Sequence, residues 1–188
     1  MRVTIEQMFE LNDQVRNGRI SGEVIQRLME NPDRYDDKLG RFGRRYDIMV
    51  NYDLGVDRLV AANKFNWKNN DVTSAHFPVE RKGVREVVVE FYEFDRVVTG
   101  EEAAAQIEAD GFVNEDVPTL LTFGKEHPIE QLRRPIVALG SRWLGSGGRW
   151  DVAFLDRLGG RRVLNLNWLH FDFYPDYRFL VFSKSAAL

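Results

Sequence analysis

The hydrophobic positions of the first 31 residues recur three and four residues apart, which predicts two short helices. Gly18 separates these helices, and Pro32 ends the second. The charged stretch 33–45 has little periodicity and predicts a linker. We therefore expect residues 1–45 to form a small helical segment ahead of a domain spanning 46–188. The periodic positions are Ile5, Met8, Phe9 and Val15 in the first helix, and Val24, Ile25, Leu28 and Met29 in the second.

Residues 46–140 predict three strands and three helices. The β-branched and aromatic residues of 86–95 are dense enough to indicate a strand on their own. Thr99 and Glu102 have the spacing of a capping box, which predicts a helix that ends at Gly111. Pro118 suits the first turn of a further helix, which we expect to stop near Gly124. The predicted strands are 46–52, 86–95 and 135–140, and the predicted helices are 56–62, 99–111 and 118–124.

The C-terminal part alternates with a period of two residues, as a strand with one buried face does. Between 163 and 168 this pattern places Leu164, Leu166 and Trp168 in the core and Val163, Asn165 and Asn167 in solvent. Beyond Leu169 the parity shifts, so that Phe171 and Phe173 would point inward and His170, Asp172 and Tyr174 outward. Residues 178–182 predict a closing strand.

The order of these elements predicts the fold class. From residue 86 onward a strand is followed by two helices and then by short strands and turns, without the alternation of strand and helix that builds a doubly wound parallel sheet. We therefore expect an α+β domain.

Composition and charge exclude several classes of protein and of functional site. The 26 basic and 29 acidic residues give a net charge of -3, which argues against a dedicated nucleic-acid-binding protein. The absence of cysteine excludes disulfides, zinc–thiolate sites and cysteine nucleophiles. No apolar run reaches the roughly 20 residues of a membrane-spanning helix. The N-terminus lacks the apolar stretch of a signal peptide, so we expect a cytoplasmic protein.

Aromatic residues and glycines are concentrated near the C-terminus. Ten of the aromatic residues lie between Trp143 and Phe182, and glycines punctuate the region at 145–148 and 159–160. The outward positions of the predicted strands carry amides, an imidazole, a carboxylate and phenols, the side chains that adaptable binding surfaces use. The simpler interpretation is that they are only the polar side of half-buried strands. Alternation by itself favours this simpler interpretation.

A resemblance to a known family favours the binding interpretation. The segments Pro135–Gly140 with Trp143, Val152 with Leu155-Asp156, and Arg162 with Leu164, Leu166 and Trp168, ending in Arg178-Phe179, resemble the variable proteins of diversity-generating retroelements. The upstream pattern Asn69, Asp71, Thr73 and His76-Phe77-Pro78 is similar to theirs as well. The resemblance covers roughly residues 46–182, and it implies a C-type-lectin-like domain.

In that family a reverse transcriptase copies a template repeat, misreads its adenines and replaces part of the coding segment. The resemblance therefore implies a non-enzymatic protein that displays a hypervariable site, in a region of about 149–178, to a macromolecular ligand, most naturally another protein. We expect the side chains of six outward positions to converge on one exposed surface, with the glycine turns bringing Arg149 and Arg161 alongside them; the six are Asn165, Asn167, His170, Asp172, Tyr174 and Tyr177. The candidate variable positions are Arg149, Trp150, Arg161, Val163, Asn165, Asn167, His170, Asp172, Tyr174 and Tyr177.

Other chemistries have weaker support in the sequence. The three histidines are far apart and form no metal-ligating pattern, so we expect no metal and no cofactor. Asp172 with Asp151 or Asp156 could form the carboxylate pair of a hydrolase. A nucleic-acid-binding role stays open because Arg149, Arg161 and Arg162 lie near aromatic residues that could stack on bases.

Overall fold

The computed structural model describes residues 45–183. The two helices predicted near the N-terminus and nearly all of the predicted linker lie outside the described residues. All described residues belong to one compact unit. No helix in this part of the chain is both long and apolar enough to cross a membrane.

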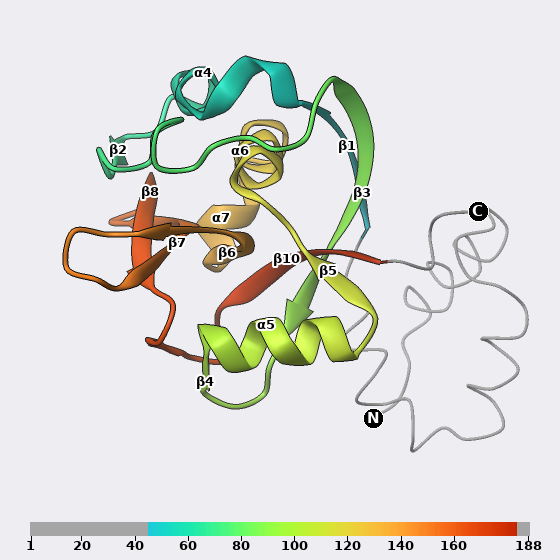
Figure 1. The fold of residues 1–188 in the computed structure, drawn as a ribbon, viewed down its shortest axis with the longest axis vertical. Coiled ribbons are helices and arrows are strands. Elements are labelled where there is room, and N and C mark those ends of the chain that lie inside the picture. The colour runs from blue at the N-terminus through green and yellow to red at the C-terminus, as the bar shows by residue number, and fades with distance from the viewer. Residues whose placement is uncertain (1–44, 184–188) are drawn as a thin grey trace, which may run out of the picture. The chain divides into compact units, whose positions relative to one another are not determined.

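The described residues form a mixed α+β structure around one large sheet, in the order β1-β3-β10-β6-β7-β8-β2, with β5 beside β10 (Figure 1). Neighbouring strands are antiparallel except β10 with β6 and β2 with β8. β4 (Val98–Thr99) and β9 (Asp172–Phe173) form a separate small sheet. The main strands are β1 Tyr46–Asn51, β2 Trp67–Lys68, β3 Val84–Glu93, β5 Phe112–Asn114, β6 Ile136–Leu144, β7 Trp150–Leu158, β8 Arg161–Trp168 and β10 Arg178–Ser183.

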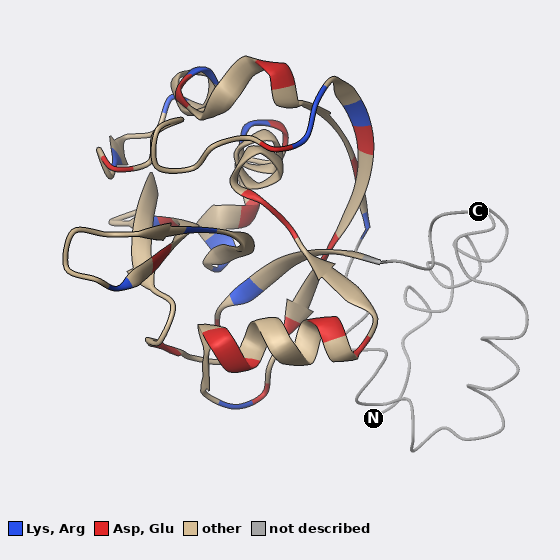
Figure 2. Ribbon diagram, in the orientation of Figure 1, with Lys and Arg blue, Asp and Glu red and all other residues tan. Residues whose placement is uncertain are grey.

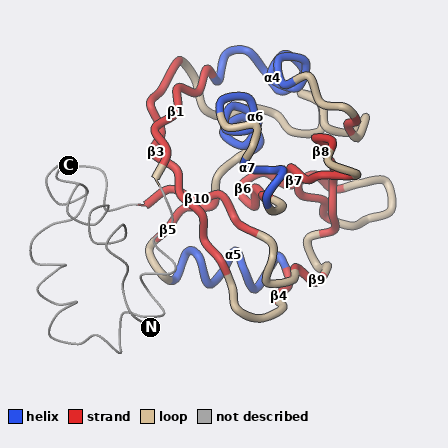
Figure 3. The backbone as a smooth tube through the Cα atoms, turned by 180° about the vertical axis from the view of Figure 1, so that it is seen from behind, coloured by secondary structure: helices blue, strands red, loops and turns tan. Residues whose placement is uncertain are grey.

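Helices cover both faces of the sheet, and the sheet separates the core into two clusters of buried residues. α4 and α6 pack with one cluster of buried residues, and α5 packs with a second cluster that contains Val152 and Phe154 of β7. Two views of the chain from opposite sides place α5 apart from α4 and α6, with the sheet strands between them (Figures 1 and 3). The helical segments are η2 Tyr52–Leu54, α4 Gly55–Asn63, α5 Gly100–Ala109, α6 Val117–Glu126 and α7 Glu130–Arg133.

The local helix signals are confirmed in detail. The Thr99 hydroxyl accepts the N–H of Glu102 at 3.2 Å, and the Glu102 carboxylate accepts the N–H of Thr99 at 3.0 Å, which completes the capping box. Gly124, however, lies inside α6. A Cβ atom at this position would lie 2.7 Å from Cδ1 of Leu155, so the glycine allows the helix to pack closely on β7. The short helix α7 was not predicted, and β6 continues past Gly140 to Leu144.

The predicted alternation in β8 is wrong at both of its ends. Val163, expected in solvent, is buried, with 7% of its surface exposed. Trp168, expected in the core, is 41% exposed. Phe171, also expected inside, is 43% exposed. It follows a turn in which its N–H donates to the carbonyl of Trp168, so strand alternation does not apply to it.

Candidate ligand-binding surface

Two glycine turns fix the β6–β7–β8 meander that carries most of the candidate residues. The turn at 145–148 joins β6 to β7, and the turn at 159–160 joins β7 to β8. Gly148, Gly159 and Gly160 have φ values of 70°, 58° and 77°, which favour glycine. The two turns lie at opposite ends of β7, a strand about 26 Å long. The expectation that these turns bring both Arg149 and Arg161 alongside one surface of candidate residues is therefore wrong.

One face of the meander carries a row of three side chains on neighbouring strands. Trp143 of β6 is paired with Asp151 of β7, and Asp151 is paired with Trp168 of β8. Cross-strand partners share a face, so the carboxylate lies between the two indoles. This face belongs to the α4 and α6 side of the sheet, because Leu155 and Leu164 of the same parity are in that core.

Three further side chains contact this row. The guanidinium carbon of Arg149 lies 4.0 Å from the ring centroid of Trp168, in a cation–π contact. The His170 ring stacks on the same indole with a centroid distance of 5.7 Å and an interplanar angle of 8°. His76 stacks on Trp143 at 4.0 Å and 7°. We call the resulting group the hairpin-end cluster, and it consists of His76, Trp143, Arg149, Asp151, Trp168 and His170.

The segment 69–78, which carries part of the family resemblance, helps to build this cluster. His76 Nδ1 lies 2.8 Å from the carbonyl oxygen of Asp71, which holds the imidazole on the loop. Burial raises the pKa of the Asp151 carboxyl and nearby Asp71 raises it further, while the positive charge of Arg149 and His170 acts in the opposite direction. The stacking of His76 on Trp143 could not be predicted from local sequence patterns, because the two residues are far apart along the chain.

Other candidate residues lie on the opposite face, toward α5. There the pairs are Val152 with Asn167, Phe154 with Asn165 and Asp156 with Val163. Val163 is buried and cannot contact a ligand. Tyr177 is half-buried, and its ring lies 6.2 Å from that of Phe154 and 5.2 Å from that of Phe173. The ten candidates thus do not share one face.

The remaining candidates are exposed but are distributed along the chain. Trp150, at the start of β7, is 48% exposed and has the parity of Val152, so it points to the α5 side. Arg161 is exposed at the other end of the hairpin. Asp172 is paired with Thr99 in the small sheet, and Tyr174 is exposed just beyond it.

Asn165 and Asn167 contact their own strand. Asn165 Oδ1 accepts the N–H of Leu166 at 2.8 Å, and Asn167 Oδ1 accepts the N–H of Trp168 at 3.0 Å. Asn165 Oδ1 also accepts from Nδ2 of Asn69 at 3.2 Å. The two side-chain amides therefore accept hydrogen bonds from backbone N–H groups at the outer edge of β8.

Asp151 and Asp156, the two alternative partners considered for Asp172 in a carboxylate pair, both lie in β7. They are five positions apart and point to opposite faces of the sheet, so at most one of them could pair with Asp172. Within residues 45–183 no group of three or more His, Asp or Glu side chains could hold a metal ion. A cleft of about 370 Å³ lies beside α4, between Asp57 and Thr73, and none of the candidate residues lines it.

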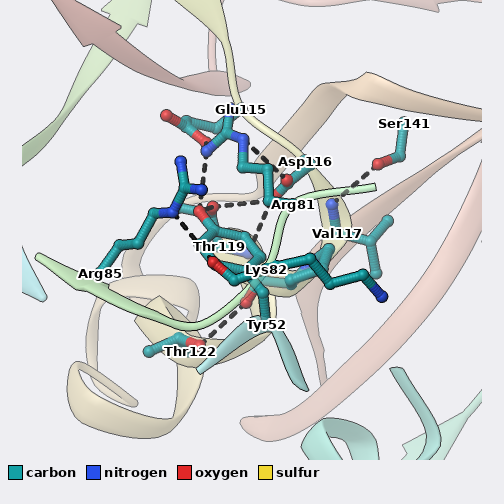
Figure 4. Close-up of polar contacts among 11 residues, drawn as sticks. Tyr52, Arg81, Lys82, Arg85, Glu115, Asp116, Val117, Thr119, Thr122 and Ser141 are labelled. Atoms are coloured by element: carbon teal, nitrogen blue, oxygen red, sulfur yellow. Dashed lines mark hydrogen bonds and ion pairs between the residues drawn. The ribbon is translucent and has the colours of Figure 1, made fainter. Parts of the chain in front are cut away.

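A second group of polar side chains, centred on the partly exposed Arg81, lies apart from the candidate residues (Figure 4). Arg81 donates to Tyr52 Oη at 2.7 Å and pairs with Glu115 at 3.1 Å and Asp116 at 3.4 Å. Thr119 completes it with contacts to Tyr52 and Asp116. Burial raises the pKa of Glu115, and Arg81 opposes that effect. These side chains contact one another, so we interpret the group as a structural link between the segment before β3 and the start of α6.

Comparison with known proteins returned no match to any family model, curated protein or solved structure.

Proposed function

We propose that this chain is a ligand-binding protein of the retroelement variable type, with its binding surface around the hairpin-end cluster. The order of elements supports the C-type-lectin-like part of this proposal. From β3 the chain runs through α5 and α6 to the antiparallel strands β6, β7 and β8, and β10 then returns beside β3. This is the arrangement of one strand, two helices and short antiparallel strands that the resemblance implies.

One observation carries the proposal: exposed aromatic and charged side chains gather at the end of a rigid hairpin. Arg149, Trp150 and Trp168 are exposed at this end, whereas Val152 and Leu164 of the same strands are fully buried. Substitution at exposed positions that lie outside the core typically changes stability by less than about 0.5 kcal/mol. A scaffold of this kind can therefore change its binding surface without losing its fold.

The exposed side chains suit a protein ligand. Tryptophan and arginine are the side chains that contribute most to protein–protein interfaces, and exposed apolar residues that gather together mark interaction sites. We therefore centre the surface on Arg149, Trp168 and His170, and Trp150 and Asn167 of the same strands border it from the opposite face of the sheet. Trp168 enters this set because it is exposed, Val163 leaves it because it is buried, and Arg161 leaves it because it lies at the other end of the hairpin.

A nucleic-acid ligand is the second candidate, because an arginine stacked on an exposed tryptophan can also stack on a base. The distribution of charge supports the protein ligand instead. In the ribbon of Figure 2 the Lys and Arg positions are spread over many elements and interleaved with Asp and Glu positions.

The DNA around the gene provides the test. We expect a second, non-coding copy of the segment encoding about residues 149–178, which differs from the coding copy mainly where the repeat has adenine. A reverse-transcriptase gene should lie nearby. A completely sequenced locus without such a repeat would contradict the proposal.

A further inference from the structure

The outer edge of β8 is only partly covered. β2 pairs with Val163 and Leu164, and Asn69 N–H then donates to the carbonyl of Leu164 at 2.8 Å before the chain turns away. On the other side, Leu169 N–H donates to the carbonyl of Trp150. Hydrogen-bonded pairs alternate along an antiparallel ladder, so Leu166 and Trp168 direct their backbone groups away from β7. The described residues contain no strand that pairs with them on that side.

The two asparagine side chains take the place of that missing strand. The N–H groups of Leu166 and Trp168, which an adjacent strand would bind, donate instead to Oδ1 of Asn165 and Asn167. Each amide thus caps the residue that follows it in the Asn-Leu-Asn-Trp sequence. Such caps keep an exposed edge from pairing indiscriminately, yet a side-chain amide can rotate away more easily than a paired strand can separate.

A charged group, Arg149, lies beside this edge, where Asp151 of the same cluster interacts with its charge without forming an ion pair. Arg149 is held over Trp168, and no carboxylate of the described residues lies within ion-pair distance of its guanidinium. A guanidinium stacked on an indole keeps its N–H donors in the plane, where they can bind a carboxylate through two parallel hydrogen bonds.

We propose that the edge of β8 at Leu166 and Trp168 binds an extended segment of a partner protein by strand addition, with an acidic side chain of that segment on Arg149. The inference rests on the proposed ligand-binding function and specifies its partner. Carbonyl oxygens of the incoming strand replace Oδ1 of Asn165 and Asn167, and main-chain hydrogen bonds set the register. A second copy of this chain joined through the same edge would place two Arg149 side chains near each other, so like charges oppose that arrangement.

The test is an NMR titration of the full chain with two capped peptides, acetyl-Thr-Val-Glu-Val-Thr-amide and its counterpart with Lys in place of Glu. We expect the backbone amide signals of Leu166 and Trp168 to shift saturably with the Glu peptide, with millimolar affinity, and at least about fivefold more weakly with the Lys peptide. Absence of these shifts at about 10 mM Glu peptide, a range that detects even millimolar binding, would overturn the proposal. Equal binding of both peptides would refute the contact between an acidic side chain of the partner and Arg149. Shifts that depend on protein concentration alone would show that a second copy of this chain binds the edge instead.

Variants separate the two parts of the proposal. Arg149→Ala should abolish the preference for the Glu peptide while the shifts at the β8 edge persist. The double substitution Asn165→Ala and Asn167→Ala should tighten binding several-fold, because no cap competes with the peptide. Asn70→Ala, in the neighbouring loop, is the matched control and should change nothing. The titration uses a single sequence and needs no retroelement, so its result is independent of whether a template repeat is found.

Discussion

Glu130 and Arg178 form a buried ion pair whose disruption should strongly destabilise the domain. Arg178 Nη1 lies 3.0 Å from Glu130 Oε2, and Arg178 Nη2 donates to the Glu130 carbonyl at 2.7 Å. Both side chains are less than a tenth exposed. The pair fixes the start of β10 to α7, beside the Arg178 N–H bond to Pro135. Glu130→Gln keeps the shape of the side chain but leaves the buried guanidinium without its counter-ion.

Removal of one partner from a buried ion pair costs about 3–5 kcal/mol. We expect Glu130→Gln to fall at the lower end, near 3 kcal/mol, because the amide oxygen can still accept from Arg178. Urea unfolding at pH 7 measures the loss as a lower midpoint with an unchanged slope. Glu126→Gln, an exposed glutamate at the end of α6, is the matched control. A loss below about 1 kcal/mol would refute the buried pair.

The pH dependence provides an independent check. Burial alone would raise the pKa of Glu130, but the hydrogen bond and charge of Arg178, with the charge of Arg133, outweigh it and hold the pKa below its usual value. A carboxyl whose pKa is lower in the folded state stabilises the fold fully above the ordinary glutamate pKa of about 4.3, and that contribution is lost as the pH falls through the folded-state pKa. The difference between wild type and Glu130→Gln should therefore shrink in acid. A difference that stays constant down to about pH 2 would show that the charge does not matter.

Three further substitutions test the scaffold and its surface. Gly140→Ala should destabilise by about 1–3 kcal/mol or prevent folding, measured by urea unfolding, because its Cβ would lie 2.3 Å from the carbonyl oxygen of Asn114. Leu164→Ala should cost about 2–5 kcal/mol in the same assay, since the side chain is fully buried. His170→Ser together with Tyr174→Ser should change the unfolding free energy by less than about 1 kcal/mol, because both residues are exposed. A larger loss in that double variant would mean that these positions support the fold.

The structural features that could be predicted from the sequence are those determined by residues close together along the chain. The Thr99 capping box, the strand around Val89 and the glycine turns were readable because their causes lie within a few positions along the chain. The α+β class followed from the order of these local elements.

What the sequence could not predict depends on tertiary contacts. Alternation in β8 assumed that one face is exposed to solvent and the other is buried, but Val163 of the expected exposed set is buried and Trp168 of the expected buried set is 41% exposed. The opposite ends of β7 separate Arg149 from Arg161, which only the strand register reveals. Likewise the roles of Asn165 and Asn167 as caps follow from how little of β8 the short strand β2 covers, a feature with no local signal.

The central claim is that exposed positions of the β7–β8 hairpin vary while its buried positions do not. Deep sequencing of the gene in a cell population that expresses the reverse transcriptase measures this directly. The proposed function predicts that substitutions concentrate at Arg149, Asn167 and His170, at codon positions where the template has adenine, and spare Val152 and Leu164. Substitutions spread evenly over exposed and buried codons, or a segment 149–178 no more variable than the rest of the gene, would contradict it.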